Sequence, residues 1–140
     1  MKKIFYIPSF IIMFASVLAT SAQAQTQRVI ASIPFAFNVG KTTLPAGRYT
    51  ITVVNPSSDR KILQIRSLNG RSSAVVLTTG IISHASDDAK LVFERTGDRY
   101  VFTHAQMAGD ETTLAAVRMK EPRNKQVAKN KKSTVVIVAE

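Results

Sequence analysis

The sequence of 140 residues contains no cysteine and no tryptophan. Without cysteine, the chain can form no disulfide bond and no thiolate metal site, and it has no cysteine nucleophile. It also lacks the cysteine to which a bacterial lipoprotein attaches its lipid. Side-chain packing and strand pairing must therefore supply the stability of the fold.

The amino-terminal residues have the layout of a secretory signal peptide. Two lysines are followed by an apolar stretch over 4–19 and by small residues that end in Ala22-Gln23-Ala24. A positive start, a short apolar middle and an A-x-A site predict a signal-peptide helix over 1–24. The apolar stretch is shorter than the roughly 20 residues that span hydrocarbon, so we expect no stable membrane insertion after cleavage. A single domain over 25–140, in the periplasm or outside the cell, is expected.

Short runs of alternating apolar and polar residues recur along this domain and predict strands. The runs cover 28–39, 48–55, 61–68, 72–79, 90–95, 99–107 and 133–140. Segment 113–119 fits either a strand or a short helix. A parallel sheet is disfavoured, because each of its crossovers needs a dozen or more residues. The pattern predicts an all-β fold, an antiparallel β-sandwich or small barrel of seven to eight strands.

Turn residues between the runs predict how the strands connect. Asn69-Gly70 is the strongest short hairpin signal, and a type I′ turn is expected because both of its central residues have positive φ. Thr96-Gly97-Asp98 predicts a three-residue hairpin connection, and 81–89 a longer loop. Pro34 has no N–H to donate to a ladder, so it is expected at an edge or a bulge.

Gly40-Lys41-Thr42 looks like the end of a phosphate-binding loop. The motif G-x-x-x-x-G-K-[ST] needs another glycine five residues before Gly40, where Phe35 stands. It also needs a helix after the lysine, and Pro45 follows instead. The string is therefore expected to connect two strands.

Three strings resemble segments of a group of small exported bacterial β-rich proteins of unassigned function. They are IPFAF (33–37), LPAGRY (44–49) and LVFERTGDRY (91–100). They match the group's IPF-x-F, LPAG-x-Y and LVF-x-R-x-GD-x-Y segments. The resemblance implies an exported β-rich domain, and it brings no catalytic residue to carry over.

Catalytic chemistry has little support in the sequence. The loop HASDD offers His84, Asp87 and Asp88 as weak candidate ligands for a divalent cation. A lone histidine with nearby aspartates is a much weaker signal than a two-histidine spacing, and solvated loop residues explain it equally. His104 is expected to be a hydrogen-bonded residue in a strand. We therefore expect no metal, no cofactor and no catalytic residue.

Acidic residues are scarce, nine against 19 Lys and Arg, and the excess gathers in residues 118–132, here called the basic segment. Its seven cations are expected to contact an anionic polymer or lipid surface. They are Arg118, Lys120, Arg123, Lys125, Lys129, Lys131 and Lys132. The alternative is a solvated, mobile loop that keeps the protein soluble. The same cations are expected to protect the edge of the β-prone run 133–140 from other chains.

The function expected from these features is that of a non-catalytic binding or structural module at the cell envelope. Export and the absence of aromatic residues in the basic segment argue against nucleic acid as a partner. A monomer is expected. Two alternatives stay open: a small metal-dependent hydrolase, and a carrier of a small apolar ligand in a barrel interior.

Overall fold

The computed structural model describes residues 27–118 and 132–140. The expected signal peptide and its cleavage site lie outside the described residues. The described chain is all-β, and no helix occurs in it. It therefore offers no helix long and apolar enough to cross a membrane.

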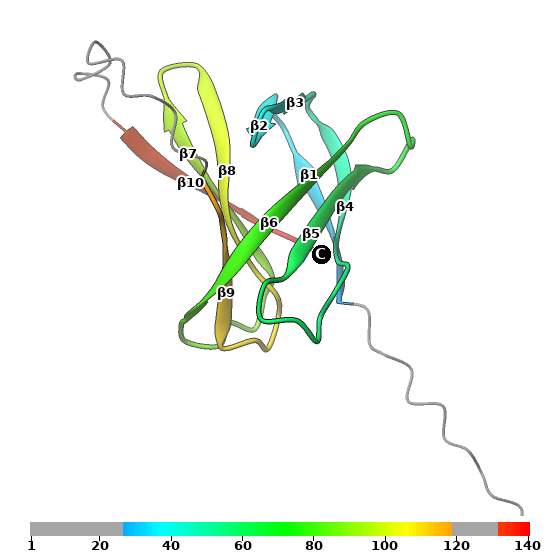
Figure 1. Ribbon diagram of the computed structural model, residues 1–140. Coiled ribbons are helices and arrows are strands. Elements are labelled where there is room, and N and C mark those ends of the chain that lie inside the picture. The colour runs from blue at the N-terminus through cyan, green and yellow to red at the C-terminus, as the bar shows by residue number, and fades with distance from the viewer. Residues whose placement is uncertain (1–26, 119–131) are drawn as a thin grey trace, which may run out of the picture.

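Ten strands make up the fold (Figure 1). They are β1 (Arg28–Ile33), β2 (Phe37–Val39), β3 (Thr42–Leu44), β4 (Gly47–Val53), β5 (Ile62–Ser67), β6 (Ser73–Ile82), β7 (Lys90–Thr96), β8 (Arg99–Gln106), β9 (Thr112–Ala116) and β10 (Lys132–Val138). The seven runs and the ambiguous segment 113–119 all contain a strand, so the all-β prediction is confirmed.

The strands form one open, mixed sheet in the order β1-β4-β5-β6-β9-β8-β2-β3, with β7 beside β8 and β10 beside β7. All pairs are antiparallel except β2 with β8, which meet in parallel at Asn38 and Val101. Strand β6 serves two ladders, because 73–77 pair with β5 and 78–82 pair with β9. Beyond β10, Glu140 exchanges two backbone hydrogen bonds with Ile30 of β1. The two ends of the strand path therefore touch at one point.

Two of the ten strands were not expected, and Pro34 accounts for one of them. The run 28–39 was predicted as one strand, but the structure breaks it at 34–36 into β1 and β2. Proline lacks the N–H that the ladder needs, so pairing ends before it. The predicted connection after Gly40 contains β3, which pairs with β2 through Thr42–Leu44. The prediction of seven to eight strands was therefore too low.

In nearly every strand, alternate side chains point inward and form the core. Its largest fully buried side chains are Tyr49, Phe37, Phe93, Ile33, Leu44, Ile51, Leu63, Ile65, Leu91 and Leu114. Phe93 lies edge-on to the rings of Phe35, Phe37 and Phe102, at centroid distances of 5.2, 5.3 and 5.8 Å. These rings fill the space between the ladders, so the interior is a packed core.

Both predicted hairpins form, with turn geometries that differ from the predicted ones. Only glycines have positive φ in the described chain, so Asn69 does not, and a type I′ turn is wrong there. Ser67 instead accepts the N–H of Gly70, and its own N–H reaches the carbonyl of Ser72. At the other hairpin Thr96 pairs with Arg99, so the connection has two residues, with Gly97 at φ 62°.

Candidate functional site

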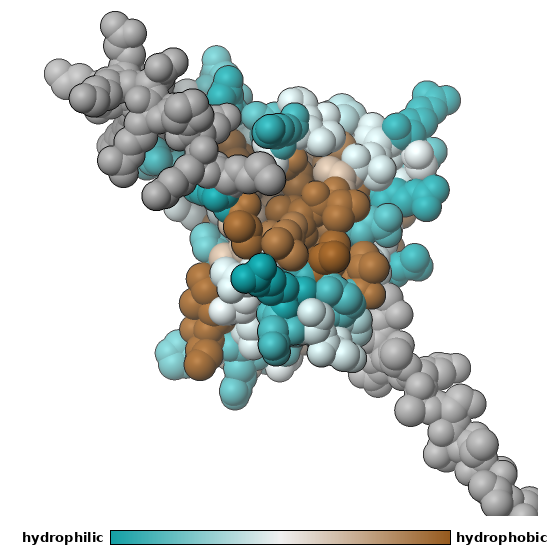
Figure 2. Space-filling view, viewed as in Figure 1, coloured by the Kyte–Doolittle hydropathy of each residue, from teal (hydrophilic) through white to brown (hydrophobic). Residues whose placement is uncertain are grey.

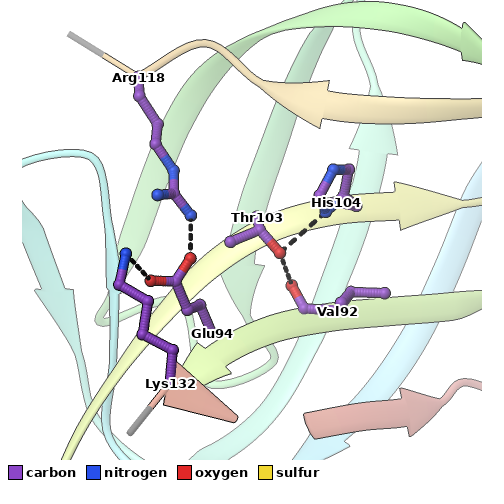
Figure 3. A network of polar contacts seen from close by, with 6 residues as sticks. All are labelled: Val92, Glu94, Thr103, His104, Arg118 and Lys132. Atoms are coloured by element: carbon purple, nitrogen blue, oxygen red, sulfur yellow. Dashed lines mark hydrogen bonds and ion pairs between the residues drawn. The ribbon is translucent and has the colours of Figure 1, made fainter. Parts of the chain in front are cut away.

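Glu94 on β7 lies between the two described ends of the basic segment (Figure 3). Arg118 follows β9, and its Nη2 donates to Glu94 Oε2 at 2.6 Å. Lys132 opens β10, and its Nζ lies 3.0 Å from Glu94 Oε1. The antiparallel register of β10 on β7 pairs Thr134 with Glu94, which brings Lys132 within reach. The basic segment therefore begins and ends at one carboxylate.

The charges at this junction are partly neutralised and remain in contact with water. The hydrogen bond from Arg118, followed by that from Lys132, lowers the pKa of Glu94 below its ordinary value of 4.5. The side chains of Arg118 and Lys132 are 57% and 67% exposed. One carboxylate facing two cations leaves one positive charge in excess, so the junction is still an electropositive point on the surface.

The other predicted cation residues of the basic segment fall outside the described residues. They are Lys120, Arg123, Lys125, Lys129 and Lys131. The pairing of Arg118 and Lys132 with Glu94 is a feature that sequence reasoning missed. Glu94 is 24 residues from Arg118 in the chain, and the two come together because β7 and β9 both lie beside β8.

Replacing Glu94 by glutamine is expected to lower the free energy of unfolding by about 0.5–1 kcal/mol at pH 7, as for an exposed ion-pair network. The folded-state pKa is lowered, so this stability is present above the ordinary pKa and is lost as pH falls through the folded one. Urea unfolding at pH 7 and pH 3 measures it, and the difference from the unsubstituted protein should be smaller at pH 3 than at pH 7. Glu111→Gln, on an exposed loop, is the control. An equal difference at both pH values would contradict this assignment.

The weak metal candidates His84, Asp87 and Asp88 are all exposed, in the loop between β6 and β7. Among residues 27–118 and 132–140, no three His, Asp or Glu side chains come together in a way that could hold a metal ion. The loop is held instead by Gln106, whose Nε2 donates to the carbonyl of His84 at 2.6 Å and to that of Asp110 at 3.1 Å. The loop thus has a clear structural anchor.

His104 is hydrogen-bonded within the sheet, as expected (Figure 3). Its Nδ1 lies 2.9 Å from Thr103 Oγ1, and that hydroxyl donates to the carbonyl of Val92. Thr103 is the extra residue of a bulge, because Val92 pairs with His104 and Phe93 with Phe102. Its hydroxyl satisfies a carbonyl at the disturbed point of the ladder. No pattern in the sequence predicted this bulge.

The three strings that carry the resemblance meet at one end of the core. Phe35 stacks on Tyr100 with ring centroids 3.9 Å apart, and Arg95 lies over the Tyr100 ring at 5.5 Å. Tyr49 packs edge-on against Phe37 and donates from its hydroxyl to the carbonyl of Pro45 at 2.6 Å. These shared residues therefore have roles in packing and in a turn.

An open depression of about 660 Å³ lies beside this cluster, between the β2–β3 hairpin and the β7–β8 turn. It is lined by Ala36, Asn38, Thr43, Thr96, Gly97, Asp98, Arg99 and Tyr100. Thr43 Oγ1 and Asn38 Oδ1 are 2.8 Å apart, so two of the polar groups already satisfy each other. Gly40, at φ 58°, turns the chain between the paired strands β2 and β3, so the string around it connects two strands as expected.

The outer face carries a row of apolar side chains that crosses four strands. Val54, Ile62, Leu77 and Val117 are direct cross-strand neighbours, and Val75 lies two residues from Leu77. Val54, Val75, Leu77 and Val117 are exposed. Figure 2 shows apolar surface gathered over the middle of β6. This apolar row is a feature that the strand pattern alone did not predict.

No family model matches this chain, and neither a curated protein nor a solved structure matches it.

Proposed function

We propose that this chain is an exported, non-catalytic β-domain that serves as a binding or structural module at the cell envelope. It contacts anionic polymer or lipid surfaces through the basic segment. The observation that supports this most directly is the Glu94 junction. Arg118 and Lys132 are the first and last cations of the basic segment, and both contact the carboxylate of Glu94. The two ends of the segment therefore lie at one place on the sheet.

The charge distribution of the described residues agrees with this proposal. The two cations at the junction remain more than half exposed while one acidic group offsets them. Exposed Lys and Arg near an anionic surface contribute about 1 kcal/mol each to binding. A segment with seven Lys and Arg residues therefore suits a surface-binding module.

The finer form of the fold is part of the same proposal: eight of the ten strands curl into a small barrel whose two ends are joined, among the described residues, only at Ile30 and Glu140. The ladder order runs from β1 through β6, β9, β8 and β7 to β10, and the hydrogen bonds between Ile30 and Glu140 support closure onto β1. The short strands β2 and β3 then lie across one end. A packed core suits a rigid display of surface charges.

Changing Lys120, Arg123, Lys125 and Lys129 to glutamine is expected to abolish retention on phosphatidylglycerol vesicles. At about 1 kcal/mol per cation, four substitutions lower partitioning by roughly two to three orders of magnitude. Co-sedimentation at physiological salt measures this, and the melting temperature should stay nearly unchanged.

The matched control removes the same charge elsewhere, by changing Arg48, Arg60, Arg66 and Arg71 to glutamine. All four are exposed residues of β4, β5 and the adjoining turns. This variant should keep most of the retention. If the segment variant is retained as well as the unsubstituted protein, the proposal is refuted. If both variants lose retention equally, net charge explains the binding and the basic segment has no special role.

A further inference from the structure

Strand β10 is paired along one edge only. Its partner is β7, in a register that runs from Lys132 opposite Thr96 to Val138 opposite Lys90. Ala139 donates to the carbonyl of Ala89 on the β7 side, whereas Glu140 bonds with Ile30 on the other side. Backbone groups alternate between the two edges of a strand. The N–H and C=O groups of Lys132, Thr134, Val136 and Val138 therefore point to the outer edge, where no described residue bonds with them.

The path of β1 explains why this edge is open. The pair Ile30–Glu140 sets an antiparallel register in which Ser32 would next oppose Val138 and Pro34 would oppose Val136. Ser32 and Val138 are not paired, and Pro34, which has no N–H to donate, would end the ladder at the position after them. The chain turns inward at Phe35, which stacks on Tyr100, and it continues as β2 beside β8. Figure 1 shows β10 (red) starting away from β1 and approaching it only near the C-terminus.

Proteins usually protect an open edge with charges, proline or a bulge. Here the described edge has a single charged residue between 132 and 138, Lys132, which is engaged by Glu94. The outward side chains beyond it are Thr134, Val136 and Val138, and the two valines are 50% and 57% exposed. The ladder of β10 with β7 has no register shift. Within the described residues, the protection expected from the basic segment comes from Lys132 alone.

We propose that the outer edge of β10 is an interaction surface for a second copy of this chain, joined by antiparallel pairing of β10 with β10. With Thr134 on the two-fold axis, Lys132 of each copy lies opposite Val136 of the other. Each of these opposed pairs has its hydrogen-bonding groups on the free edge, so each exchanges two backbone hydrogen bonds. The two copies together then form one continuous sheet through β7, β10, β10 and β7.

A second copy fits this edge because the edge is complementary to itself. The central pair would be threonine opposite threonine, a favourable cross-strand combination, and its neighbours pair lysine with valine. The two Lys132 residues lie four strand positions apart, about 14 Å, which exceeds the Debye length of about 8 Å at physiological salt. No like charges are opposed. The proposal replaces the sequence-based expectation of a monomer.

Sedimentation of the purified protein over a concentration series tests the proposal. The unsubstituted protein should sediment as a dimer, and Thr134→Lys, which opposes two lysines on the axis and leaves the backbone intact, should raise the dissociation constant at least tenfold. Thr79→Lys makes the same change at an exposed position of β6 and should leave the dimer unchanged. A monomer at every concentration would overturn the proposal. A dimer that withstands Thr134→Lys would also overturn it and would place the contact elsewhere, such as on the apolar row.

A single engineered cysteine gives an independent test, because the natural chain has none. Thr134→Cys places two thiols across an axis with Cα atoms about 5.5 Å apart, within the range that a disulfide spans. Oxidised glutathione should convert this variant to a reducible covalent dimer at least tenfold faster than it converts Val75→Cys, an exposed site on β6. Equal rates for the two variants would contradict pairing through β10.

Discussion

Replacing Phe93 by alanine is expected to lower the free energy of unfolding by about 3–5 kcal/mol, the usual cost of emptying a buried aromatic site. Phe93 is fully buried and touches three other phenylalanine rings edge-on. Its neighbours lie on β2, on β8 and in the bend between β1 and β2. Backbone pairing holds β2 and β8, so these strands cannot collapse into the cavity.

Urea unfolding followed by far-UV circular dichroism measures this loss. Domains of this size have a total stability of about 5–15 kcal/mol, so the variant should unfold at a much lower urea concentration, or be unfolded already. Val75→Ala is the control, because Val75 is 62% exposed and its loss should cost no more than about 0.5 kcal/mol. Equal effects of the two substitutions would show that Phe93 is not central to the core.

Tyr49 should respond very differently to two substitutions. Tyr49→Ala removes a buried ring that packs on Phe37, and about 3–5 kcal/mol of stability should be lost. Tyr49→Phe keeps the ring and removes only the hydrogen bond to the carbonyl of Pro45, so about 1 kcal/mol should be lost. Chemical denaturation of the two variants separates packing from hydrogen bonding. A Tyr49→Phe variant as unstable as Tyr49→Ala would mean that the hydroxyl holds the turn at 45–47 in place.

Alkaline pH tests the same residue without changing the core. Burial raises the pKa of Tyr49 above its ordinary value of 10.0. The neutral form is favoured in the folded state, so its contribution is complete below the ordinary pKa and is lost as pH rises through the folded one. The stability gap between the natural protein and Tyr49→Phe should therefore narrow above pH 10.

The sequence predicted the parts of the fold that depend on local alternation. Val29, Ala31 and Ile33 share one parity and are all buried, as are Ile51 and Val53. Such positions can be recognised because a strand with one buried face must alternate. The sequence predicted an edge or a bulge at Pro34, but it did not predict that the strand would end there. Whether proline sits at an edge, or ends the strand and redirects it, depends on where β8 lies.

The alternation of apolar and polar residues did not predict features that depend on partners distant in the sequence. Asn69-Gly70 predicted a hairpin correctly, but the hydrogen bonds of Ser67 selected another turn geometry. The Thr103 bulge arises from the mismatch of β7 and β8, which no single run records. For the candidate site, the cations were visible in the composition. Their common partner Glu94 was not, because strand order, and not sequence distance, brings it to Arg118 and Lys132.

Because β6 pairs with both β5 and β9, it affects how the protein unfolds locally. Its first half is bonded to β5 and its second half to β9, and Thr78, fully buried, donates to the carbonyl of Lys61 where the two halves meet. Neither ladder can separate without breaking bonds on this strand. Amide protons near Val76 and Thr78 should therefore exchange with deuterium only through complete unfolding, whereas those of β3 should exchange through local opening. Strand β6 makes two ladders a single cooperative unit.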